Sequence, residues 1–320
     1  MPVEANFRTD LVCICMEQLS RMGCPLRTKL KDHEVVIRCF AALHRRLAPA
    51  PRNVKVAREL QYPPTQQGHK GLRLVLEKLE RGDDLTPHMS GTIFDPMWND
   101  AVLNEWGLHH FHLGTSRFKP DKRLLKRSNH VLLAYVNDTT AYCVDVRQHK
   151  ENGIEVWRCA KLMDIIHANW PEVLEPFSLG FRSLYSERFD DRAVLELRAS
   201  GVTPIYVAPD NSTYGLIGGG SATDTGFGTM YKGKKHLVGG TSLRAVRRAG
   251  AALDYARDCQ RWLKEHEAEV ITLYANNGVP LGVGPRFHLC VVDGKLAPVE
   301  VSSGVPIRVP GGQPVDVESG

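Results

Sequence analysis

The sequence predicts an α+β fold with a helical N-terminal portion, a small antiparallel β-sheet and a C-terminal α+β portion. Apolar residues recur at helical spacing in the first hundred residues. From Leu108 to Arg147 an alternation of apolar and polar residues replaces that spacing, and after Ser200 the sequence is enriched in Gly, Val and Thr. We therefore expect residues 1–107 to be helical, 108–186 to carry the sheet and a helix, 187–310 to form the C-terminal region, and 311–320 to be a flexible tail.

The helices of the N-terminal portion are predicted from apolar residues three or four positions apart. Residues that begin or end helices bound these segments, among them Gly23, Asp32 and Gly82. Asp95-Pro96 is a typical helix start, with a capping carboxylate followed by proline at the first helical position. The expected helices are 10–22, 32–46, 70–81 and 95–106.

Strands follow where side-chain polarity alternates, and Asn137-Asp138 predicts a tight turn that joins two of them into a hairpin. The expected strands of this sheet are 108–113, 131–136 and 141–147. Beyond it we expect helices at 156–170, 190–200 and 241–270, and strands at 203–207, 213–217, 271–274, 287–292 and 299–301.

Composition limits the function classes. The chain is 42% apolar and 24% charged, which is ordinary for a soluble globular protein, and its net charge of +5 permits contact with a polyanion without requiring it. The eight cysteines form no CxxC pair, and no apolar window is long enough for a membrane span. We therefore expect a cytoplasmic protein with reduced thiols and no membrane segment.

A histidine cluster is the main candidate for chemistry. His109, His110 and His112 lie within four positions, and the two-residue period of a strand places His110 and His112 on one face. Imidazoles can serve as acid and base near neutral pH, and guanidinium groups match phosphate oxygens. The hypothesis is metal-independent RNA cleavage, with a catalytic set of His110, His112, His149, Arg117, Arg147 and Lys150.

Basic residues are concentrated beside this cluster. Six of the eleven residues from Arg117 to Arg127 are Lys or Arg, and further arginines recur on the predicted helix 241–270. Such residues contact nucleic-acid phosphates in many proteins, although a solvated surface remains the alternative. The predicted nucleic-acid contacts are Lys119, Lys122, Arg123, Lys126, Arg127, Arg244, Arg247 and Arg248.

The order of elements in this region also resembles a known family. A leading strand, a basic loop with Arg117, Leu132-Leu133-Ala134-Tyr135-Val136, a turn and a strand ending in Arg147-Gln148-His149-Lys150 are similar to the small β-sheet of RelE/ParE-type toxin ribonucleases. The resemblance covers residues 108–150. It implies an RNA-cleaving or ribosome-associated toxin fold, with Arg117, Arg147, His149 and Lys150 at the positions of basic catalytic residues.

Three functions therefore stay open. The first is a ribonuclease-like effector, a toxin or defence component, with RNA as its partner. The second is a non-catalytic nucleic-acid- or protein-binding adaptor in a larger complex. The third is a metal-dependent hydrolase in which His110, His112 and His149 bind Zn²⁺ and leave one position for water.

Overall fold

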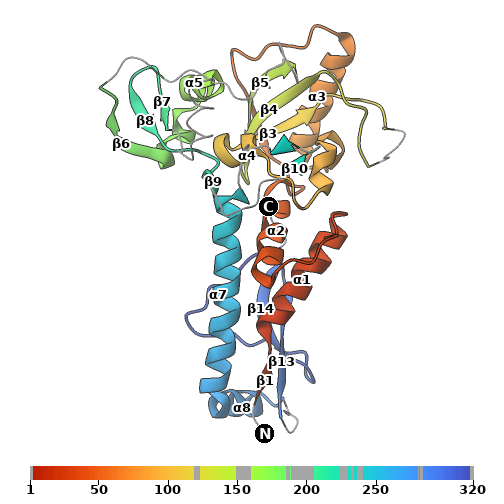
Figure 1. The fold of residues 1–320 in the computed structure, drawn as a ribbon, viewed down its shortest axis with the longest axis vertical. Helices are drawn as coiled ribbons and strands as arrows, with labels where there is room; N and C mark the ends of the chain where they lie inside the picture. Colours follow the sequence, from red (N-terminus) through yellow and green to blue (C-terminus); the bar gives the residue numbers. More distant parts are fainter. Residues whose placement is uncertain are drawn as a thin grey trace. The chain divides into compact units, whose positions relative to one another are not determined.

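The computed structural model describes residues 3–118, 123–148, 160–184, 188, 205–222, 230–231, 234–235, 241–279, 281 and 284–317. The fold is mixed α+β, with helices toward both ends of the chain, so the predicted class is confirmed (Figure 1). The chain divides into two compact units. Unit 1 comprises Met1–His44, Phe94–Pro96 and Ala245–Gly320, and unit 2 comprises Arg45–Ile93 and Met97–Arg244.

Unit 1 joins the first helices to the last strands. Its sheet has the order β1-β13-β14, in which β1 (Glu4–Ala5) is parallel to β13 (Arg286–Val292) and β13 is antiparallel to β14 (Lys295–Glu300). Its core includes Phe7, Leu11, Phe40 and Phe287, together with alanines three or four positions apart on the long helix. The helices are α1 (Phe7–Arg21), α2 (Asp32–His44), α7 (Leu243–Glu265, of which Leu243 and Arg244 belong to unit 2) and α8 (Glu267–Asn276).

Three expectations for unit 1 differ from the structure. The single helix predicted at 241–270 is instead two helices, α7 ending at Glu265 and α8 beginning at Glu267. The predicted strand 271–274 is wrong, because these residues lie in α8, where Val270 and Tyr274 are buried four positions apart on one helical face. Residues 315–317 of the predicted flexible tail are attached to the fold, whereas Gly311, Gln313 and Pro314 are exposed. The N–H of Leu296 donates to the carbonyl of Val315, and Val317 is buried.

Unit 2 is built on a four-stranded sheet of order β2-β5-β4-β3. The strands are β2 (Asn53–Val56), β3 (Leu108–His112), β4 (His130–Val136) and β5 (Thr140–Gln148). Neighbours are antiparallel except β2 and β5, which are parallel. The predicted hairpin is confirmed, and the side-chain oxygen of Asn137 accepts the N–H groups of Thr139 and Thr140 in its turn.

The helices of unit 2 are α3 (Gln66–Arg81), α4 (Ala101–Trp106) and α5 (Ala160–Asn169). In α3 the hydroxyl of Thr65 accepts the N–H of Gly68, and Gly82 ends the helix in the left-handed conformation at φ +77°. The predicted start of α4 at Asp95 is wrong. The capping carboxylate is that of Asp100, which accepts the N–H of Leu103 at 3.1 Å.

Shorter elements complete the described residues. A second sheet of order β6-β8-β7 follows α5, and two further strand pairs, β9 with β12 and β10 with β11, precede α7. The predicted helix 190–200 lies outside the described residues. Within the described helices, none combines the length and the apolar character needed to cross a membrane. The remaining bounds are β6 (Ser178–Arg182), β7 (Tyr206–Val207), β8 (Ser212–Tyr214), β9 (Ser221–Ala222), β10 (Met230–Tyr231), β11 (Lys234–Lys235), β12 (Thr241–Ser242) and the 3₁₀ turns Thr86–His88, Gly91–Phe94, Pro171–Val173 and Glu175–Phe177.

Candidate functional site

The histidine pair lies on β3, one of the two edge strands of the four-stranded sheet. His110 is opposite Leu133 and His112 is opposite Val131 on β4. The two rings lie at a centroid distance of 6.2 Å with their planes 78° apart, whereas His109 stacks on Phe111 of the other face at 5.9 Å. The spatial arrangement of His110 and His112 therefore follows the two-residue period of the sequence.

The two histidines differ in access to solvent. His112 is only 2% exposed, which leaves its ring little contact with an RNA strand. The side chain of His110 is 16% exposed, and its Nδ1 lies 3.6 Å from a carboxylate oxygen of Asp100. The cavity beside His110 has a volume of about 30 Å³, enough for roughly one water molecule, and is lined by Arg45, Met89, Ser90, Thr92, Ile93, Trp98, Asp100, His109 and His110.

A further histidine, which the sequence pattern did not mark, supports this strand. His88 is fully buried, and its Nδ1 donates to the backbone carbonyl of His112 at 2.9 Å. Among the described residues, its Nε2 has no hydrogen-bond partner. Burial lowers the pKa of His88 to about 4, so the ring is neutral near pH 7. His88 thus fixes the end of β3 as a neutral donor.

Acid is expected to destabilise unit 2 through His88. The unfolded chain binds a proton at this ring near the ordinary pKa of 6.5, whereas the folded protein does so only near pH 4. The free energy of unfolding therefore has its full value above pH 6.5. As the pH falls toward 4, protonation of this ring in the unfolded chain lowers the free energy of unfolding by about 3 kcal/mol. Urea unfolding measured between these pH values should therefore show that the free energy of unfolding falls more steeply with decreasing pH for the wild type than for His88→Gln. Identical pH dependence in the two proteins would contradict this assignment.

Of the predicted catalytic cations that the structure describes, Arg147 lies in the same sheet as the histidines and Arg117 does not. Register places Arg147 in one row with Val131 and His112, two strands and therefore about 10 Å from the edge. Its Nε donates to the carboxylate of Asp145 at 2.8 Å. Arg117 lies outside the sheet, in the loop between β3 and β4. Burial lowers the pKa of Lys78 on α3, and the charge of Arg117 acts in the same direction. His149 and Lys150 lie outside the described residues.

The part of the chain that the structure describes contains no residue cluster that would support the zinc hypothesis. No group of three or more His, Cys, Asp or Glu side chains there is arranged to hold a metal ion. His149, the third ligand in that hypothesis, is outside these residues. Zinc binding by His110, His112 and His149 therefore stays a prediction.

The loop between β3 and β4, residues 114–129, is here called the basic loop. Its two arms are tied by backbone hydrogen bonds, from the N–H of Lys126 to Ser116 at 2.7 Å and from the N–H of Phe118 to Leu124 at 2.9 Å. A side chain at Gly114 would lie 2.0 Å from the carbonyl oxygen of Lys126, so the arms need glycine there. The side chains of the predicted contacts Arg123, Lys126 and Arg127 are exposed, whereas Lys119 and Lys122 lie outside the described residues.

An open pocket of about 290 Å³ adjoins the basic loop. We call it the phosphate pocket, because cations and polar groups line it and none of its described lining residues carries a carboxylate. The hydroxyl of Ser128 accepts the N–H of Leu113 at 2.9 Å, and Arg127 donates to Ser90 at 3.1 Å. Its lining residues are Thr65, Gln67, Gly68, Leu113, Gly114, Lys126, Arg127, Ser128, Asn129 and His130.

The arginines predicted to contact nucleic acid on α7 have different surroundings. Arg244 donates to the backbone carbonyl of Ile217 at 2.6 Å. Arg248 donates to the carbonyl of Asp316 at 3.1 Å and lies over the ring of Phe40, 5.1 Å from its centroid. Burial lowers the pKa of Arg248. Arg247 is exposed, whereas Arg244 and Arg248 contribute to the packing of the fold.

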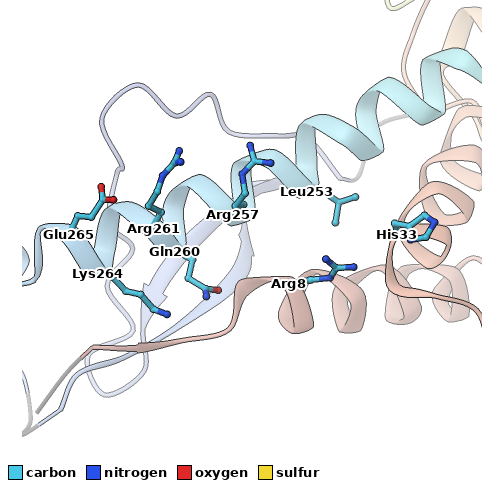
Figure 2. A pocket seen from close by; sticks show the side chains of 8 residues that line it. All are labelled: Arg8, His33, Leu253, Arg257, Gln260, Arg261, Lys264 and Glu265. Carbon is cyan, nitrogen blue, oxygen red and sulfur yellow. The ribbon is translucent and has the colours of Figure 1, made fainter.

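Unit 1 has a basic groove of about 590 Å³ between α7 and the starts of α1 and α2, shown in Figure 2. Its arginines are paired with carboxylates: Arg8 with Asp32 at 2.9 Å, and Arg261 with Asp258 at 2.8 Å. Arg257 is likewise paired with acidic neighbours on α7. This groove therefore offers a polyanion less uncompensated charge than the phosphate pocket does. Its lining residues are Arg8, His33, Leu253, Arg257, Gln260, Arg261, Lys264 and Glu265.

The geometry thus favours two regions of unit 2, the His110 cavity and the phosphate pocket with the basic loop. The pocket is open and carries exposed positive charge, whereas the cavity accepts little more than a water molecule. Comparison of the chain with protein-family models, curated proteins and solved structures gave no match.

Proposed function

We propose that unit 2 binds RNA through its sugar-phosphate backbone, at the basic loop and the phosphate pocket, and does so without cleaving it. The observation that carries the proposal is the lining of the pocket, where Lys126 and Arg127 lie beside polar side chains and, in the described part of the chain, beside no carboxylate. Cations that are not neutralised by the fold attract phosphates, and neighbouring Ser and Asn side chains supply hydrogen bonds to phosphate and sugar oxygens.

Binding is supported better than cleavage by the surroundings of the predicted catalytic groups. His112 is buried, Arg147 is paired with Asp145, and the cavity beside His110 is too small for a nucleotide. A general base must come within hydrogen-bond reach of the proton that it removes. The ribonuclease activity, and with it the toxin or defence role, therefore remains a prediction with less support than backbone binding.

The proposal predicts salt-sensitive RNA binding. We expect a fluorescein-labelled single-stranded RNA of about 20 nucleotides to bind in fluorescence anisotropy, with a slope of log K against log salt of about −2 to −3 for three or four phosphate contacts. Absence of binding at about 50 mM salt, or a slope near zero, would overturn the proposal.

The same incubation tests cleavage. RNA recovered from it in the presence of EDTA should run at full length on a denaturing gel. If the wild type shortens the RNA and the His110→Gln variant leaves it at full length, the ribonuclease hypothesis is favoured instead, since Gln cannot act as an acid or base at neutral pH.

A further inference from the structure

An exposed aromatic stack lies at the start of α3. The rings of Tyr62 and His69 are nearly parallel, at 13°, with their centroids 5.5 Å apart. Tyr62 is 63% exposed, so one face of a large ring stays open to solvent. An exposed ring held in a fixed stack offers a flat surface to a second planar group.

The backbone around this stack is tightly packed. A side chain at Gly68 would lie 2.5 Å from Cβ of Pro63, and the hydroxyl of Thr65 caps the helix at the N–H of Gly68. The turn between Tyr62 and His69 therefore has little room to rearrange. A platform held in this way loses little conformational entropy when a ligand binds.

Two basic residues, Lys70 and Arg73, lie close to the stack on α3. His69, Lys70 and Arg73 are exposed, and at 100° per residue they share the outward side of α3. That side lies opposite the buried residues Leu72 and Val75. An aromatic platform bordered by cations is the arrangement by which proteins bind single-stranded nucleic acid.

The stack also adjoins the phosphate pocket. Thr65, Gln67 and Gly68, which line that pocket, belong to the same turn that separates Tyr62 from His69. Since a helix is about 10 Å across, pocket and stack lie within the reach of one strand a few nucleotides long. A strand with its phosphates at Lys126 and Arg127 can thus place a base on Tyr62.

We propose that the Tyr62–His69 stack is a base-stacking platform, so that the RNA bound by unit 2 is single-stranded. This inference rests on the proposed function. In a duplex the base faces are covered by neighbouring pairs, whereas a single strand can turn a base onto an aromatic ring. Phosphate contacts supply the attraction, and the platform supplies the preference for unpaired bases.

The test compares Tyr62→Ala with the conservative variant Tyr62→Phe. Removal of the ring should weaken binding of a single-stranded oligouridine RNA about 5- to 100-fold, the usual range for one stacked base, whereas Tyr62→Phe should bind like the wild type. Binding of inorganic polyphosphate, which has no bases, and of duplex RNA should be the same in all three proteins. Circular dichroism checks that the variants are folded.

The outcomes separate this inference from the proposed function. If the wild type binds neither oligouridine nor polyphosphate, backbone binding fails and the platform fails with it. If both bind and Tyr62→Ala leaves the affinity for oligouridine unchanged, backbone binding stands and the platform is overturned. An equal loss of affinity for polyphosphate would also overturn it, because Tyr62 would then act on the fold or the charge rather than on a base.

Discussion

Replacing both Lys126 and Arg127 with glutamate is expected to lower the affinity for single-stranded RNA about 100-fold at low salt. Both side chains are exposed and line the phosphate pocket. A unit charge 4 Å from a phosphate contributes about 1 kcal/mol in water, and reversal removes that attraction and adds a repulsion of similar size at each position. Screening by salt reduces the total.

A matched control separates local contacts from net charge. Arg27 and Lys29 are an exposed Arg and Lys in unit 1, so Arg27→Glu/Lys29→Glu changes the net charge by the same amount. We expect this control to bind RNA within about threefold of the wild type, because long-range charge effects are screened at physiological salt. Fluorescence anisotropy titrations of the wild type and the two double variants measure these affinities. An equal loss of RNA affinity in both variants would show that RNA binds elsewhere on the chain.

The second large effect is expected at Gly71. A methyl group at this position of α3 would lie 2.0 Å from the carbonyl oxygen of Leu113, which is backbone and cannot rotate away. Gly71→Ala must therefore separate α3 from the end of β3, and we expect it to lower the free energy of unfolding by about 3 kcal/mol. Urea unfolding followed by circular dichroism measures the change.

Gly250 provides the opposite case. It lies within α7, and among the described residues no atom outside the local helix backbone lies within 4 Å of an added methyl group there. Gly250→Ala should stabilise the protein by about 0.5 to 1 kcal/mol, because alanine favours a helix interior over glycine. A gain of stability at both positions would show that helix propensity rather than contact with Leu113 controls Gly71, whereas a loss at Gly250 would contradict the propensity argument.

Local patterns predicted most elements of the fold. The alternation of 131–136 and 141–147 around Asn137-Asp138 predicts both strands and their turn, and the register of β4 and β5 follows from the turn as far as the pair Ala134 and Cys143. Beyond that pair an irregularity shifts the register, so that Leu133 is opposite Asp145. Pairings between distant residues could not be predicted in this way. The parallel pairing of Asn53–Val56 with β5, for example, joins segments more than eighty residues apart. The strand predicted at 271–274 is wrong because the alternation of Ile-Thr-Leu-Tyr is typical of a strand, whereas in α8 only Tyr274 of these residues is buried.

The site was predicted in part, for a related reason. The shared face of His110 and His112 depends only on strand geometry, which the sequence contains. The burial of His112 depends on distant segments, and the bond from His88 to its carbonyl joins residues 24 positions apart. The Tyr62–His69 stack depends on a turn between Pro63 and Gly68, so only the bend of the chain, and not the ring contact, could be read from the sequence.

Unit 1 is assembled mainly from two long stretches of chain, Met1–His44 and Ala245–Gly320, that leave the ribosome at different times. Glu4 pairs with Arg286, and the apolar faces of α1 and α2 are covered partly by residues beyond 245. At about 5 to 20 residues per second, roughly ten seconds to one minute of translation separates these partners. Meanwhile Phe7, Leu11 and Phe40 have no core to enter, so chaperones that hold apolar nascent segments have their natural target here. Unit 2, formed by an almost continuous stretch of chain, can fold while the ribosome is still completing its neighbour.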